Sequence, residues 1–84
     1  MREEVLLGRC RRGKVRNIAF ADFVHLLEAF GFRLDRVRGS HWVFHRQELG
    51  LRLVDQPLQG QAKPYQVRQL LRCVDEYDLN LEPR

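Results

Sequence analysis

The spacing of apolar residues between positions 20 and 30 constrains the fold more than any other feature of this chain. These residues recur at intervals of three and four, as on one face of an α-helix: Phe20, Phe23, Val24, Leu27 and Phe30. Asn17 is a candidate N-cap for this helix. Gly31 supplies its C-terminal stop, because glycine takes the left-handed conformation at little cost. The helix therefore has one apolar face that must pack against the rest of the domain.

Three short strands are expected after this helix, at Phe32–Val37, His41–His45 and Leu51–Asp55. Alternation puts apolar side chains on one face, namely Phe32, Leu34, Trp42, Phe44, Leu51 and Leu53. The other face then carries Arg33, Asp35, Val37, His41, Val43, His45, Arg52 and Val54. A sheet with one apolar and one polar face is typical of antiparallel strands whose apolar side is covered by helices.

A second helix is predicted after a loop at Gln56–Lys63. Pro64 suits its first turn, where the missing N–H costs nothing. Apolar residues again follow helical spacing, at Val67, Leu70, Leu71, Val74 and Tyr77. The order α-β-β-β-α predicts an α+β domain in two layers, with a three-stranded antiparallel sheet and two helices on one face.

The net charge of +4 is concentrated at the N-terminus. Residues 1–16 carry six basic and two acidic side chains, whereas the rest of the chain is neutral. We expect a basic N-terminal segment at 1–16, the domain at 17–78 and a C-terminal tail at 79–84. The segment is predicted to hold a short helix near Glu3–Leu7 and a mobile connection at Arg9–Lys14. Further arginines cluster around the second strand, which favours a polyanion, and specifically nucleic acid, as partner.

Other function classes find little support. No apolar run approaches the roughly 18 residues that a membrane span needs. Cys10 and Cys73 lack metal-ligand spacing and are too few for a disulfide framework, so a reducing cytoplasm is expected. Neither a metal site nor a cofactor is predicted.

His41 is the leading candidate for chemistry, because it opens a strand directly after the turn at Gly39–Ser40. An imidazole at the rim of a sheet can give or take a proton near neutral pH. RNA supplies its own nucleophile, the 2′-OH, and its own electrophile, the adjacent phosphate. One histidine with nearby arginines is therefore a minimal set for RNA cleavage. The alternative is a histidine that merely closes the turn by hydrogen bonding.

Four further residues are candidate RNA contacts: Ser40, Arg38, His45 and Lys63. Ser40 either caps the turn, which is ordinary turn chemistry, or contacts a phosphate or ribose. His45 lies roughly 13 Å from His41 along an extended strand, too far to share a proton with it. Lys63 precedes the second helix, whose N-terminus attracts phosphate, although a simply solvated lysine is an equal alternative.

Three stretches resemble the HicA toxin family: LLEAFGF at 26–32, GSHWVF at 39–44 and KPYQVRQLL at 63–71. The resemblance extends from about Asn17 to Tyr77. It implies a fold like that of double-stranded-RNA-binding domains and a metal-independent endoribonuclease acting on messenger RNA. It also implies that His41 is catalytic and that a HicB antitoxin binds the protein and blocks its active surface. Many members carry a Pro-x-His in the third-strand region, whereas residues 53–58 here contain no histidine.

Two alternatives to a toxin nuclease remain. The first is an RNA-binding module of the same fold that does not cut. The second is a pure protein-interaction partner that docks another chain on the open sheet face.

Overall fold

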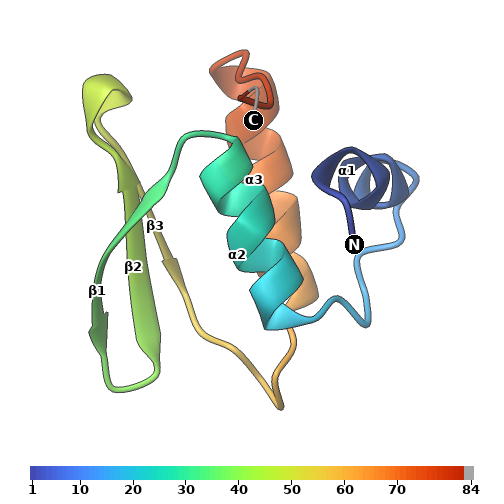
Figure 1. Ribbon diagram of the computed structural model, residues 1–84, viewed down its shortest axis with the longest axis horizontal. Helices are drawn as coiled ribbons and strands as arrows, with labels where there is room; N and C mark the ends of the chain where they lie inside the picture. The colour runs from blue at the N-terminus through green and yellow to red at the C-terminus, as the bar shows by residue number, and fades with distance from the viewer. Residues whose placement is uncertain (83–84) are drawn as a thin grey trace.

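A three-stranded antiparallel sheet lies against two helices, and a third helix lies on the far side of those two (Figure 1). This computed structural model describes residues 1–82. In chain order the elements are α1 Glu3–Arg11, α2 Phe20–Ala29, β1 Arg33–Arg38, β2 His41–Arg46, the 3₁₀ turn η1 Gln47–Leu49, β3 Leu51–Asp55 and α3 Pro64–Glu76. The strands lie side by side in the order β1-β2-β3. The predicted α+β class and the α-β-β-β-α order are confirmed.

The core lies between the sheet and the helix pair α2 and α3. Its largest fully buried side chains are aromatic: Phe23, Phe30, Phe32 and Phe44. Trp42 belongs to the same face, since its ring meets that of Phe20 edge-on at a centroid distance of 5.1 Å. The core thus fills the covered face at β2 and β3, whereas Leu34 and Val37 of β1 stay exposed on that face. On the opposite face only Val43 is buried among residues 1–82 of the three strands, and it does not belong to this core.

A β-bulge in β1 makes one part of the predicted alternation wrong. The register shifts between Leu34 and Arg36, so that Val37 pairs with Trp42 and not with a residue of the open face. Simple alternation fails here because a bulge adds one residue to one strand only. Asp35 is the extra residue, and the strand then continues with Arg36 and Arg38 on the open side.

The N-terminal segment contains more regular structure than expected. Helix α1 extends to Arg11, so the predicted mobile connection is wrong for residues 9–11. Cys10 is buried, and its helix packs on α2 because Leu6 and Cys10 supply an apolar stripe toward the core. The Arg11 guanidinium also lies 2.9 Å from the Asp75 carboxylate of α3.

Asn17 is not the N-cap of α2. That position belongs to Ala19, and Asn17 has a left-handed backbone with φ of 58°. At the other end of the chain, the Glu82 amide donates to the Ala29 carbonyl at 2.6 Å, so the predicted tail packs back against α2. Residues 83–84 of that tail lie outside the described part of the chain.

Candidate functional site

His41 begins β2 at the tip of the β1–β2 hairpin. Gly39 takes a φ of 59° in the two-residue turn, a conformation that favours glycine. His41 is exposed, and its side chain makes no hydrogen bond or ion pair with any of residues 1–82. The Ser40 hydroxyl is equally free within that range. Neither side chain closes the turn by hydrogen bonding, so both are open to a ligand.

The open face that carries this imidazole also carries several guanidinium groups, of which only Arg38 is opposite His41 in the strand register. Arg38 pairs with His41 across the hairpin, which puts the two side chains on the same side of the sheet. Arg38 and Arg52 have no carboxylate partner among the described residues, whereas Arg36 lies 3.7 Å from Asp35. Two unneutralised arginines thus give the open face a positive field, with Arg38 opposite His41 and Arg52 opposite His45.

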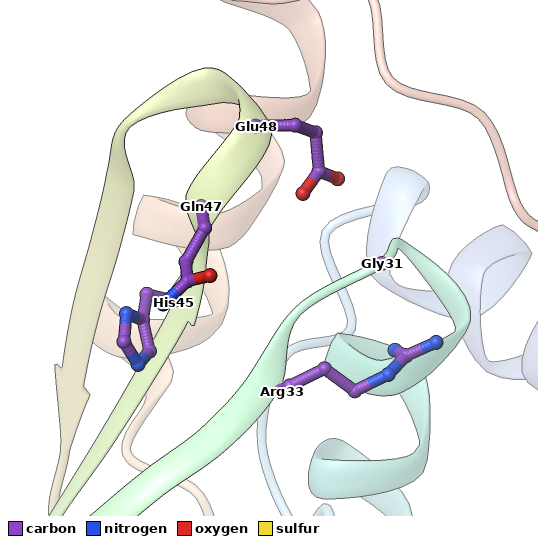
Figure 2. A pocket seen from close by; sticks show the side chains of 5 residues that line it. All are labelled: Gly31, Arg33, His45, Gln47 and Glu48. Atoms are coloured by element: carbon purple, nitrogen blue, oxygen red, sulfur yellow. The ribbon is translucent and has the colours of Figure 1, made fainter.

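The other end of β2 is different in character. His45 lies half-buried, with Nε2 3.4 Å from Oδ1 of Asp35. Beside it the structure has a hollow of about 240 Å³ lined by Gly31, Arg33, His45, Gln47 and Glu48 (Figure 2). His41 and His45 are therefore not brought together, as their separation of roughly 13 Å along the strand predicts.

Lys63 lies at the N-terminus of α3, where its carbonyl accepts from the amides of Gln66 and Val67. Its ammonium group makes no ion pair within residues 1–82. The start of α3 and the β1–β2 turn lie toward the same end of the molecule (Figure 1). The segment before α3 is fixed to the one before α2, because the Ala62 amide donates to the Ile18 carbonyl. No contact joins Lys63 to His41 in the described structure.

Sequence reasoning missed Asp55, the last residue of β3. Asp55 pairs with Trp42 on the covered face and is only 1% exposed. Burial raises the pKa of its carboxyl to about 7, and its Oδ2 atom has no hydrogen-bond partner among residues 1–82. The signal was present, since alternation from Leu51 and Leu53 puts position 55 on the apolar side. Asp55 and His41 lie on opposite faces of the sheet.

The cysteines and the remaining possible metal ligands of residues 1–82 do not form a second centre. Burial raises the pKa of both thiols, Cys10 and Cys73, which lowers the thiolate fraction that a nucleophile needs. Within residues 1–82, no three histidine, cysteine or carboxylate side chains gather in a way that could hold a metal ion. No helix in that range has the length and apolar character to cross a bilayer.

The chain matches a model of a known protein family. Residues 20–74, which run from the start of α2 to near the end of α3, match the model described as HicA toxin of bacterial toxin-antitoxin. No curated protein and no solved structure matches the chain. The family match spans more than half of the sequence and contains the whole sheet, the hairpin turn and His41. This chain therefore belongs to the HicA family of toxins of bacterial toxin–antitoxin systems.

Proposed function

We propose that this HicA family member is an endoribonuclease that cleaves messenger RNA in the cytoplasm with His41 as general acid or base. The observation that carries the proposal is the free, exposed imidazole of His41 opposite Arg38 on a cationic open face. An imidazole in that position is accessible to a polyanionic chain, and nothing in residues 1–82 competes for its nitrogens.

The reaction that suits this arrangement is internal transesterification. The 2′-oxygen attacks the adjacent phosphorus and loses its proton, and the bond from phosphorus to the 5′-oxygen breaks. His41 takes the first proton or delivers the second, and water handles the other. The products are a 2′,3′-cyclic phosphate and a 5′-hydroxyl. Neither a metal ion nor a cofactor is needed for this proton transfer.

Arg38 supplies the second requirement, which is stabilisation of negative charge on the phosphorane. Its guanidinium is always protonated and has a fork of donors that suits phosphate oxygens. Ser40, Lys63 and His45 extend the proposed RNA contact: Ser40 beside the reacting phosphate, Lys63 at the N-terminus of α3 and His45 farther along β2. This open face is also the surface that a HicB-like antitoxin has to cover to block the toxin.

The products test the proposal. Purified protein is incubated with labelled RNA, with and without excess chelator, and the new termini are identified. We expect 2′,3′-cyclic phosphate and 5′-hydroxyl ends at the same rate in both samples. Cleavage that stops in chelator, or that leaves 5′-phosphate ends, contradicts the proposed chemistry.

A non-catalytic RNA-binding module is the second candidate, because the same open face binds phosphates whether or not it cuts. It predicts salt-sensitive binding to duplex RNA, recovered intact. A protein that binds RNA but forms no new ends supports this alternative.

A further inference from the structure

The hollow at the end of β2 opposite His41 is not used by the chemistry described above. Gly31 and Arg33 form one wall, while His45, Gln47 and Glu48 form the other (Figure 2). Its volume of about 240 Å³ is below the roughly 300–1,000 Å³ typical of sites for drug-sized ligands. It therefore has room for one small planar group and not for a larger ligand.

Hydrogen bonds hold the walls of this hollow before anything binds. Arg33 Nη1 donates to the carbonyls of Glu28 and Phe32, at 3.0 and 2.8 Å. Arg46 Nε donates to Glu48 Oε1 at 2.7 Å, and its Nη1 donates to the Phe30 carbonyl at 3.0 Å. The arginines are thus already occupied, so the hollow is preorganised but is not a site for a free anion.

Gly31 lines the hollow at a crowded position. Its φ is 89°, and a Cβ there would lie 2.9 Å from Glu82 Oε2 and 3.0 Å from Arg46 Nε. A side chain at this position would push against Glu82 and Arg46, the ion-pair partners of the lining residues Arg33 and Glu48.

The polar groups left free in the hollow are few and specific. The Gln47 amide has no partner within residues 1–82 and offers both a donor and an acceptor. Glu48 keeps one carboxylate oxygen free, and its hydrogen bond with Arg46 lowers the pKa of the carboxyl, which stays an acceptor at neutral pH. His45 adds a flat ring on which another ring can stack.

We propose that this hollow binds one unstacked RNA base that carries an exocyclic amino group, and so sets the sequence preference of the toxin. An amide and a carboxylate oxygen read the hydrogen-bonding edge of such a base, while the His45 imidazole stacks on its face. Uracil is disfavoured, because the carbonyl oxygens that flank its N3–H repel a carboxylate. The position of this base relative to the cut rests on the proposed RNA cleavage at His41.

The distance between His41 and His45 along β2 sets which nucleotide reaches the hollow. His41 and His45 lie on the same open face of β2, roughly 13 Å apart. An RNA strand with its reacting phosphate at His41 therefore reaches the hollow with a neighbouring nucleotide, not with the two that flank the broken bond.

The test uses two readouts, so that failure of cleavage and failure of the hollow are distinguishable. In the first, randomised RNA is cleaved and the new ends are sequenced. We expect wild type to disfavour uracil at one position near the cut, outside the two nucleotides that flank the broken bond. Glu48→Gln, whose amide also donates, should reduce that bias at least threefold at that position alone. Gln47→Ala should weaken it similarly.

Matched controls are Glu76→Gln and Gln69→Ala, both exposed on α3 and away from the hollow. They should keep the wild-type bias. A bias that is unchanged in Glu48→Gln and Gln47→Ala, or equally changed in the two controls, overturns the assignment of the hollow.

The second readout is binding by the His41→Ala protein to short oligomers that differ in a single base. We expect weaker binding when uracil replaces that base, and loss of the difference in His41→Ala combined with Glu48→Gln. If the wild type never cuts but the difference persists, the cleavage proposal falls and the base site stands. Equal binding of all oligomers overturns the base site.

Discussion

The two ends of strand β2 carry the same side chain in opposite settings. His41 is exposed and unpaired at the hairpin turn, whereas His45 is half-buried against Asp35 beside a hollow whose walls are held by ion pairs. The first setting suits a group that exchanges protons with a ligand. The second suits a group held in one orientation for recognition. Residue type and strand face are identical, so the difference arises from what the neighbouring elements place around each ring.

The largest expected effect is a contrast in cleavage rate between the two histidines. His41→Ala should lower the single-turnover rate by about 10²–10⁴-fold, the usual contribution of general acid–base catalysis. His45→Ala should lower it less than roughly tenfold, because it removes a binding contact only. Rates on one labelled RNA, with folding checked by circular dichroism, provide the measurement. Equal losses of rate in both variants would contradict the different roles of the two histidines.

Asp55, on the covered face of the sheet, should affect the stability of the fold and not catalysis. The folded protein keeps the Asp55 proton up to about pH 7, whereas an unfolded aspartate loses it near pH 3.8. The folded state therefore binds more protons between these values, and the free energy of unfolding should fall as pH rises through this window and then level off.

Asp55→Asn should remove that pH dependence, as measured by urea unfolding at several pH values. At pH 8 the variant should be more stable than wild type by roughly 1–3 kcal/mol, since no charge is buried. Asp78→Asn is the control, because Asp78 is exposed. A wild-type pH profile in Asp55→Asn contradicts the buried, protonated carboxyl.

Two glycine substitutions test how tightly the structure packs beside the hollow at the His45 end of β2. Gly31→Ala should cost about 2 kcal/mol of unfolding free energy, from the left-handed backbone and from contact with Arg46 and Glu82. Gly50→Ala has a similar φ of 66° with open space around it, and should cost about 1 kcal/mol. Thermal unfolding of both variants measures the difference. If Gly31→Ala costs no more than Gly50→Ala, the wall at Gly31 is looser than described.

The smallest effect concerns the salt dependence of RNA binding. Arg38→Gln and Arg52→Gln, made in the non-cutting His41→Ala protein, should each reduce the slope of log affinity against log salt by about 0.7. Arg36→Gln should reduce it less, because Asp35 already lies 3.7 Å from that guanidinium. Filter binding over a range of salt concentrations measures the slopes. Equal reductions in all three variants would remove the distinction between free and paired arginines.

The sequence was enough to predict most of the fold, because the helical spacing in α2 and α3 and the alternation in β2 and β3 each agree with one packing. Three features escaped it for physical reasons. The bulge at Asp35 depends on pairing with β2, not on the strand's own pattern. The length of α1 depends on packing against α2. The hollow joins Gly31 to Gln47 and Glu48, which are far apart in sequence and meet only through the register of the hairpin.

For the candidate site too, features set by the local sequence pattern could be predicted, and features set by contacts between distant segments could not. The exposure of His41 could be expected from the turn and the strand alternation, since both are local. The contacts that hold the walls beside His45 could not be expected, because Arg33 pairs with Glu82 and Arg46 donates to the Phe30 carbonyl, and both partners come from distant segments.

Chemical rescue shows whether the His41 imidazole moves the proton in RNA cleavage. The rate of His41→Ala is measured on labelled RNA with increasing free imidazole, beside wild type. We expect almost no cleavage by His41→Ala without imidazole and a rate that rises with the imidazole concentration, while the wild-type rate is unaffected. Cleavage by His41→Ala at the wild-type rate without imidazole would contradict it.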